Sequence, residues 1–553
     1  MPVASPCVAP TSHLDRAWPV IAPPRLAASG LILFAAVWHL VYLIRNCPLD
    51  LAADEAHYWD WSRHLDWSYY SKGPLVAWLI RLSCELFGAF SVRLCGTELI
   101  AVRLPAVACG AGLLAGLYVL AARTLKSDWR ALAVVATAVS LPVLAAGATV
   151  MTIDAPFTCA WVWALVFTHA AIFRQGNWNW AMAGVLIGIG ILAKYTMVLL
   201  LPCVGMFLLV HPVHRSQLRR SGFWLACGIA AICCVPILIW NIKYDWVTVR
   251  HVGWQAGAQA QGIRWLGPLR FVVEQAGLLL FFWFACWAAA IWRERPGHSQ
   301  DAGRAFLWWT SIPVFAMFVI ISLKTPGQLN WPIAGYISGL ILAVNWLANR
   351  FVSASPTWCR IHRAFLILTT VAGMSLTAAI HYPTLIQPIL AVISGAPTED
   401  SPLPMRRYDP TARLRGWSFL AGNIDATRRL CEMLGDDPII ATSFWNLSGE
   451  IAFYCEGHPD VQCLGPAIGQ RMSQYDLWRP NVLWDPDAFR GRTFIFVGDL
   501  APEIVQAFDA VDDTWWVDYT ENGHVLSYWQ VTICRGYRGF GPPARWCGGA
   551  LHF

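Results

Sequence analysis

Long apolar runs separated by short polar connections fill the first two thirds of the chain. A helix needs roughly 20 apolar residues to cross the hydrocarbon core of a bilayer. The runs are 26–44, 104–122, 131–150, 155–173, 180–192, 197–210, 223–240, 269–292, 306–323, 329–348 and 364–380. This pattern predicts a polytopic α-helical membrane protein with about eleven transmembrane helices.

Two stretches of this pattern need separate interpretation. Residues 180–192 and 197–210 are short, so they are either two spans or two halves of one broken helix. The second alternative would reverse the side of every later connection. Residues 74–88 are apolar but short and carry Arg81 and Glu85, which favours an amphipathic helix at the membrane interface over a span.

The positive charges of the connections predict the orientation. If residues 1–25 form a cytoplasmic tail, the short Arg-rich connections fall on the cytoplasmic side, as the positive-inside rule requires. These charges are Arg123, Lys126, Arg130, Arg174, Arg215, Arg219, Arg220, Arg293, Arg295, Arg304, Arg350, Arg360 and Arg363. The first outer loop, 45–103, and the chain after about residue 382 then lie outside. The first 25 residues lack a convincing cleavage site, so the first span is expected to stay as an anchor.

The end of the chain has a different pattern, with apolar runs of only four to six residues in a polar background. Strands are predicted at 438–442, 461–464, 493–499 and 524–533, and helices at 447–455 and 501–511. The sequence therefore predicts a membrane domain over 26–395 and a soluble α/β domain over 396–553. A disulfide between Cys455 and Cys463 is one open alternative in this domain.

The amino-acid composition also indicates a membrane protein, and the motifs that the sequence lacks reduce the number of possible functions. Of 553 residues, 57% are hydrophobic and only 13% are charged, where soluble proteins carry about 25%. The sequence holds no Walker loop, no dinucleotide-binding glycine motif and no His or Cys spacing typical of a metal site. Asp485 and Asp487 flank a proline and are interpreted as a turn. We therefore expect no nucleotide donor, cofactor, metal ion or nucleic-acid partner.

Ionisable side chains gather at the outer ends of the predicted spans. They are Asp54, Glu55, Lys72, Asp154, Lys194, His251 and Lys324, with Gln328 and Asn330 close by. A charged group at membrane depth costs about 2.5–3.5 kcal/mol even on the mildest scale. Each one alone has a simpler explanation, such as an interfacial lysine or a helix N-terminal acid. Their common side of the membrane favours a functional site.

A carboxylate among cations at the outer surface suits transfer of a sugar from a polyprenyl phosphate. The carboxylate takes the proton of the incoming hydroxyl or amine. The cations stabilise the departing phosphate, which needs no general acid. One carboxylate suffices for displacement with inversion, whereas retention requires a second carboxylate as nucleophile.

Several motifs carry a family resemblance. "DEAHYWDWSRHLDWSYYSKGPLVAWLIRL" followed by "VRLPAV", then "MTIDAPF", "GILAKYT", "PILIWNIKYDWVTVRH" and "LKTPGQLNWPIAGY", resemble the bacterial branch of glycosyltransferase family 39 in order and spacing. That branch contains protein mannosyltransferase-like and aminoarabinose transferase-like enzymes of the GT-C fold. "RMSQYDLW" near the end is similar to tails of one subgroup. The resemblance implies a GT-C glycosyltransferase of the bacterial inner membrane, with its active site and C-terminal domain outside.

The resemblance also implies roles for individual residues. Asp54 matches the carboxylate taken as base or acceptor-orienting group, and Glu55 and Asp154 are the other two catalytic candidates. Substrate binding is assigned to Lys72, Lys194, His251, Lys324, Tyr58, Tyr70 and Gln328. This chain has Lys72-Gly73-Pro74 where the family often has a lysine followed by two prolines. The implied partners are a polyprenyl-phosphate-linked sugar, an extracytoplasmic acceptor and membrane lipid; the sugar, the acceptor and the oligomeric state stay open.

Two further alternatives remain at this stage. The aromatic residues between Tyr58 and Tyr70 are either a belt at the membrane interface or rings that stack on a sugar, and the belt is favoured. A transporter or glycolipid flippase is the main competing function, and a ligand-binding scaffold is a third. A transporter would place its charges mid-membrane in broken helices, whereas here they lie at the outer ends.

Overall fold

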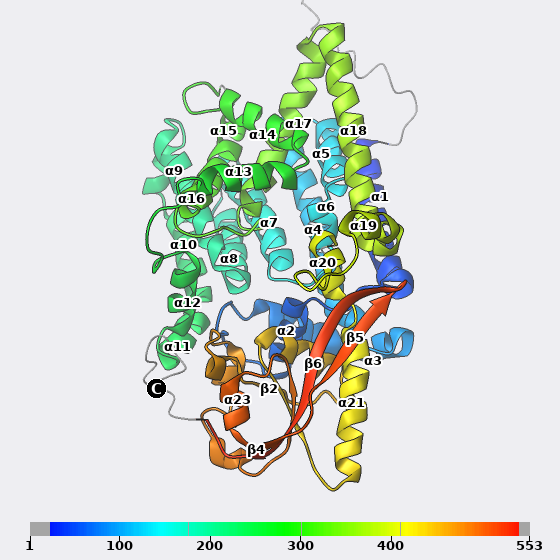
Figure 1. Cartoon of the computed structure of the whole chain (residues 1–553). Helices are drawn as coiled ribbons and strands as arrows, with labels where there is room; N and C mark the ends of the chain where they lie inside the picture. The colour runs from blue at the N-terminus through cyan, green and yellow to red at the C-terminus, as the bar shows by residue number, and fades with distance from the viewer. Residues whose placement is uncertain (1–22, 175, 300, 410, 541–553) are drawn as a thin grey trace, which may run out of the picture.

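The computed structural model describes residues 23–540 except 175, 300 and 410, so most of the predicted N-terminal tail lies outside the described residues. An upright bundle of helices carries a smaller sheet domain at one end (Figure 1). The bundle helices are α1 Pro24–Val41, α4 Leu99–Leu125, α5 Asp128–Val139, α6 Pro142–Gly147, α7 Asp154–Phe173, α8 Asn177–Ala193, α9 Leu200–Val210, α10 Ser221–Cys233, α11 Val235–Lys243, α12 Val247–Gln255, α13 Gly267–Leu278, α14 Phe282–Arg293, α15 Ala302–Trp309, α16 Ile312–Ile321, α17 Ile333–Ser353 and α18 Pro356–His381.

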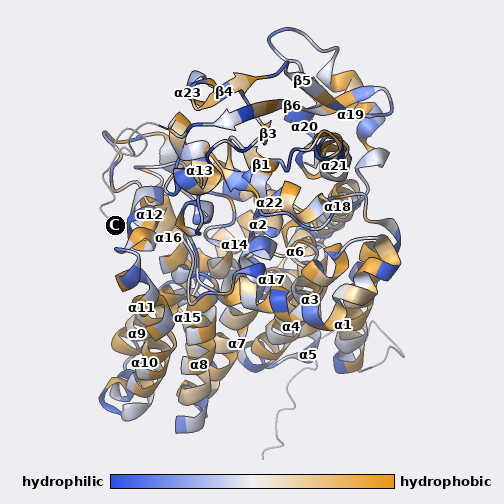
Figure 2. Ribbon diagram, turned by 90° about the horizontal axis from the view of Figure 1, so that it is seen from below, coloured by the Kyte–Doolittle hydropathy of each residue, from blue (hydrophilic) through white to orange (hydrophobic). Residues whose placement is uncertain are grey.

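Every predicted span coincides with helix, but several are broken or short. Within the described residues, seven helices are long and apolar enough to cross a membrane, or eight if one bent pair counts as a span. That pair, α13 and α14, bends by 114° inside predicted span 269–292. Pro142 begins α6 and separates it from α5 inside predicted span 131–150. Apolar residues dominate α8 to α10, with polar residues at their ends (Figure 2).

The two short apolar runs form two separate passes. Helix α8 follows the C-terminal end of α7 and returns to its N-terminal end, where Lys194 contacts Asp154. The next helix starts there and runs back, because Phe207 of α9 lies against Phe173 at the far end of α7, with ring centroids 6.4 Å apart. The alternative of one broken helix is therefore wrong.

The loop 45–103, predicted to lie outside and called the first loop below, contains two helices, α2 Ala53–Arg63 and α3 Leu75–Cys95. Helix α3 has 21 residues, which makes it longer than the predicted interfacial segment 74–88 and sufficient in length and composition for a span. In Figure 1 it lies level with α2, at the end of the bundle that faces the sheet. The helix ends at Gly96, whose backbone is in the left-handed conformation (φ 77°). Glycine suits this position because any residue with a Cβ would be strained in that conformation.

The chain from α20 Pro404–Tyr408 onward, called the C-terminal domain below, holds a six-stranded sheet of order β2-β1-β3-β6-β4, with β5 also paired to β6. The strands are β1 Ile439–Thr442, β2 Gln462–Cys463, β3 Phe494–Val497, β4 Phe508–Val511, β5 Trp515–Glu521 and β6 His524–Tyr537. Strand β1 is parallel to β2 and β3, and β6 is antiparallel to β3, β4 and β5. The helices include α21 Trp417–Met433, α22 Trp445–Tyr454 and α23 Pro502–Gln506.

The four predicted strands are present, but the elements between them differ from the prediction. The second half of predicted helix 501–511 is strand β4, which extends the sheet along β6. Strand β5 and helix α21 were not predicted. Cys455 and Cys463 are buried free thiols, so the open disulfide alternative is not realised.

The C-terminal domain packs directly on α2 of the first loop. Gly449 of α22 makes this close approach possible, because a Cβ there would lie 2.9 Å from the backbone nitrogen of His57. Four of the loop's aromatic residues are buried in the protein: Tyr58, Trp59, Trp61 and Tyr69 are each at most 3% exposed, whereas Trp67 is 58% exposed. The favoured interpretation of an aromatic belt is therefore wrong for these four residues, since their neighbours are protein side chains.

Candidate active site

A polar cavity of about 230 Å³ lies where the bundle, the first loop and the C-terminal domain meet. Its lining comes from all three parts of the structure. The contributing segments are α2 and the irregular segment after it, the entry to α7, the residue after α8, α12, the segment before α17, and the C-terminal domain. The lining residues are Asp54, His57, Tyr58, Tyr70, Ser71, Lys72, Thr152, Ile153, Asp154, Lys194, His251, Gln255, Gln328, Asn330, Trp331, Trp445, Arg471, Ser473 and Gln474.

Eight of the ten residues expected from the sequence line this cavity. They are Asp54, Asp154, Lys72, Lys194, His251, Tyr58, Tyr70 and Gln328. Segments separated by nearly 300 residues therefore bring their polar side chains to one place. Glu55 and Lys324 are the two exceptions, and each has a different partner.

Asp54 presents its carboxylate to the cavity from the first turn of α2. Its side chain is exposed, and within the described residues no group donates a hydrogen bond to it. Protein surrounds the carboxyl closely enough that poor solvation raises its pKa above the usual value, while Lys72 and Arg471 oppose the rise. Such a carboxylate is accessible and more basic than an ordinary aspartate, as a general base requires.

Asp154, the first residue of α7, has both carboxylate oxygens engaged. Lys194 Nζ donates to Oδ1 at 2.6 Å, and Asn330 Nδ2 donates to Oδ2 at 2.6 Å. The residue does not cap its helix through its side chain, because the N-cap position belongs to Ile153. Asp154 thus joins three separate segments and holds the Lys194 ammonium in place.

The cavity holds more cationic than anionic side chains. Lys194 has Asp154 as its partner, whereas Lys72 and Arg471 have no carboxylate within salt-bridge distance among the residues that the structure describes. Burial, followed by the nearby Lys194 ammonium, lowers the pKa of Lys72. An anionic ligand would relieve the mutual repulsion of these cations.

Two histidines of the wall are neutral. Burial, reinforced by Arg471, lowers the pKa of His57 to about 3 and that of His251 to about 3. His57 Nε2 accepts a hydrogen bond from Trp61 Nε1 at 3.1 Å. His251 packs against the ring of Tyr70, with centroids 5.0 Å apart. At neutral pH these rings contribute shape and hydrogen-bonding capacity and no charge.

Glu55 is fully buried beneath the cavity and does not reach it. Arg103 of α4 donates to both of its oxygens, at 2.8 Å for Nη2–Oε2 and 3.0 Å for Nε–Oε1. The backbone nitrogens of Met151 and Ala52 donate to it at 2.7 and 2.9 Å. The expectation of a catalytic Glu55 is not supported, because a carboxylate with four such donors is committed to joining the first loop to α4 and α7.

Lys324 also lies outside the cavity. Its side chain is exposed, and its Nζ donates to the carbonyl oxygen of Gly262 at 3.3 Å. Gln328 and Asn330, only a few residues further along, do line the cavity. The segment before α17 therefore turns between these positions, which spacing along the sequence could not reveal.

The C-terminal domain contributes four wall residues that the sequence argument missed as site residues: Arg471, Trp445, Ser473 and Gln474. One signal was available, since Arg471 begins the quoted motif "RMSQYDLW". Nothing in its local pattern indicates that this segment reaches the end of the membrane bundle.

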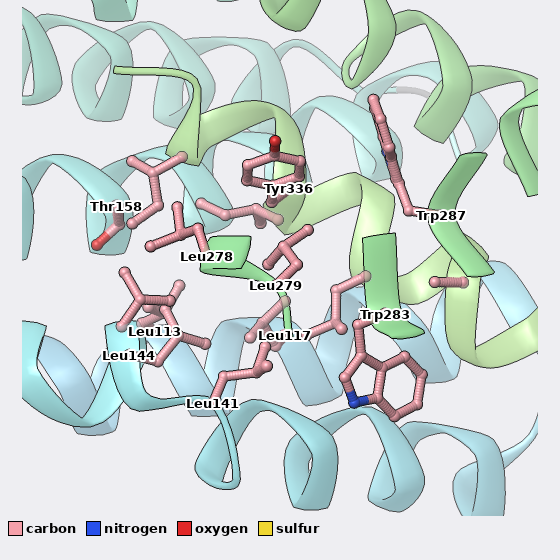
Figure 3. Close-up of a pocket in the computed structure, with 15 residues that line it drawn as sticks. Leu113, Leu117, Leu141, Leu144, Thr158, Leu278, Leu279, Trp283, Trp287 and Tyr336 are labelled. Atoms are coloured by element: carbon pink, nitrogen blue, oxygen red, sulfur yellow. The ribbon is translucent and has the colours of Figure 1, made fainter. Parts of the chain in front are cut away.

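A second cavity lies inside the bundle and differs in character. It is apolar, has a volume of about 30 Å³ and is surrounded by leucines such as Leu113 and Leu278 that point toward one another (Figure 3). Thr158 and Tyr336 supply hydroxyls to its wall, and no charged side chain lines it. A space of this size holds water at most, so it is too small for a sugar substrate.

Comparison with known proteins agrees with this architecture. Residues 71–240 match the family described as dolichyl-phosphate-mannose-protein mannosyltransferase. The lipid A galacturonosyltransferase RgtD of Rhizobium johnstonii is 30% identical over 329 residues, which cover 58% of this chain. The match spans 65% of that relative's length, slightly less than two thirds.

The fold is similar to that of ArnT from Cupriavidus metallidurans. The crystal structure with bound undecaprenyl phosphate superposes with a TM-score of 0.60 at 16% identity, covering 91% of this chain and 98% of ArnT. The apo structure of the same protein gives a TM-score of 0.56. The family resemblance expected from the sequence and the GT-C fold are therefore both confirmed.

Proposed function

We propose that this chain transfers a monosaccharide from a polyprenyl-phosphate-linked donor to an acceptor on the outer side of the bacterial inner membrane. The observation that carries the proposal is the polar cavity at the end of an apolar bundle. In it, an accessible carboxylate lies beside cations that form no salt bridge with any residue that the structure describes, Lys194 excepted. The ArnT structure of similar fold was solved with undecaprenyl phosphate, which supports a donor of this chemical class.

The cavity supports a single displacement. Asp54 takes the proton of the acceptor hydroxyl or amine, whose lone pair attacks the anomeric carbon of the donor. The bond from that carbon to the phosphate oxygen breaks, and its electron pair leaves with the polyprenyl phosphate. Nearby ammonium groups stabilise the charge that develops on the phosphate.

The engagement of Asp154 favours inversion of configuration. A retaining mechanism needs a second carboxylate free to attack the anomeric carbon. Both oxygens of Asp154 already accept short hydrogen bonds, from Lys194 and Asn330. We therefore assign Asp154 to positioning Lys194 for the phosphate or the sugar, and Asp54 alone to the proton transfer.

The acceptor we propose is a lipid-linked glycan. The curated relative RgtD acts on lipid A, an acceptor that itself lies in a membrane. The test is transfer by the purified protein in nanodiscs from radiolabelled polyprenyl-phosphate sugars, one neutral and one a uronic acid, to lipid A and to peptide acceptors. We expect labelled lipid A whose new linkage is inverted relative to the donor, also in the presence of a chelator.

Other outcomes of that test are equally informative. Retained configuration would contradict the single displacement. Movement of the donor lipid across the bilayer without transfer to any acceptor would instead support the flippase alternative.

The pH dependence of transfer should follow two side chains of the cavity. Asp54 must be ionised to accept a proton, so kcat/KM is expected to fall as the pH drops through its raised pKa. Lys72 must be charged to hold the phosphate, so the alkaline limb should lie below the pKa of an ordinary lysine. Lys72→Arg is expected to shift the alkaline limb upward and leave the acidic limb in place. A profile in which both limbs move would contradict these assignments.

A further inference from the structure

We propose that Arg471 binds the phosphate of the lipid-linked donor together with Lys72, so that the C-terminal domain supplies part of the donor site. This inference rests on the proposed function. It also predicts that the bundle and first loop alone cannot bind the donor normally, although they contain every catalytic candidate expected from the sequence.

The guanidinium of Arg471 is placed to bind a ligand. It lies over the ring of Trp445, with its central carbon 5.1 Å from the ring centroid. Its one hydrogen bond within the described residues is a weak one, from Nη1 to the carbonyl oxygen of Met472 at 3.4 Å. A guanidinium has five N–H donors, so most of those of Arg471 remain available to a ligand in the cavity that the residue lines.

The electrostatic surroundings place Arg471 near the proposed reaction centre. The charge of Arg471 influences Asp54 on α2, Lys72 after it, and His251 of α12, all of which line the same cavity. Two cations facing one cavity without a carboxylate partner repel each other until an anion binds. A phosphate diester supplies that anion, and its oxygens match the planar fork of an arginine.

The segment that carries Arg471 is fixed in place by polar contacts. Asp476 accepts hydrogen bonds from the backbone nitrogen and the hydroxyl of Ser473, at 2.7 and 3.1 Å. Gln474 Oε1 accepts from the backbone nitrogen of Tyr70 at 2.8 Å. The segment is thus bonded to the loop that carries Lys72, and this hydrogen bond helps to position the two cations relative to each other. Such preorganisation lowers the cost of binding.

Steady-state kinetics with Arg471→Ala test this inference. We expect the KM for the polyprenyl-phosphate donor to rise roughly 10- to 100-fold, the range typical of a charge-assisted hydrogen bond. The KM for the acceptor and the thermal unfolding midpoint should stay near those of the wild type. Arg471→Lys should recover part of the affinity, because it restores the charge and not the fork. Undecaprenyl phosphate alone, titrated into the protein in nanodiscs, should bind correspondingly more weakly to Arg471→Ala.

Arg490→Ala is the matched control, because Arg490 lies in the same domain and pairs with Asp487 at the surface. The inference is overturned if Arg471→Ala matches this control in donor KM, or if only the acceptor KM rises, which would make Arg471 a site for an acceptor anion. An absence of transfer by the wild type would instead count against the proposed function.

Discussion

Asp54→Asn is expected to lower kcat for sugar transfer by about 10²- to 10⁴-fold, the usual contribution of a general base. The amide keeps the size of the side chain and removes its ability to accept a proton. Because no group among the described residues donates a hydrogen bond to Asp54, the substitution leaves no structural partner unpaired. The thermal unfolding midpoint and the affinity for undecaprenyl phosphate should therefore change little.

The measurement is single-turnover transfer from a radiolabelled donor, alongside a thermal unfolding curve in the same nanodiscs. Asp513→Asn, at an exposed position of the C-terminal domain outside the cavity, serves as the matched control. If Asp54→Asn transfers sugar at the wild-type rate, the proton must go elsewhere and the assignment is wrong. If the variant binds donor poorly as well, Asp54 orients substrates and its role as base alone is incomplete.

Glu55→Gln is expected to lower the stability of the protein, whereas Asp54→Asn lowers kcat and leaves stability nearly unchanged. The two effects differ although Glu55 directly follows Asp54 in the chain. The substitution removes the charge that faces the guanidinium of Arg103, and both side chains are at most 2% exposed. Leaving a buried charge without its partner costs about 3–5 kcal/mol. We expect a markedly lower unfolding midpoint and a lower yield of folded protein, with activity lost in proportion to folding.

A double-mutant cycle separates this structural role from a catalytic one. Glu55→Met and Arg103→Met should each destabilise the protein, and the double variant should be more stable than the sum of the two predicts. The cycle also controls for the other bonds of Arg103, which donates to the carbonyl oxygens of Leu49 and Asp50. A well-folded Glu55→Gln with no activity would show instead that Glu55 takes part in the reaction.

These opposite expectations follow from the geometry of α2. Adjacent residues of a helix point about 100° apart, so Asp54 faces the cavity while Glu55 faces α4 and the entry to α7. Both carboxylates stand at the helix N-terminus, where either would be favourable. Sequence position therefore cannot distinguish them, and only the placement of Arg103 does.

The amino-acid sequence by itself determined the membrane bundle and most of the candidate site. Apolar run length is a local property, so each predicted span coincides with helix in the structure. The family motifs at Asp54, Lys72, Asp154 and Lys194 marked side chains that do meet in one cavity. The alternating apolar runs near the end likewise predicted four strands of the sheet.

The tertiary structure alone decided what each of these groups contacts. Glu55 pairs with Arg103 beneath the cavity, and Lys324 lies outside the cavity and contacts Gly262. Both positions depend on partners from distant segments of the chain. The C-terminal domain covers α2, where Tyr58, Trp59 and Trp61 are buried, and it brings Arg471 to the cavity. No pattern within a segment records such docking, since it depends on shape and charge complementarity between surfaces that lie hundreds of residues apart.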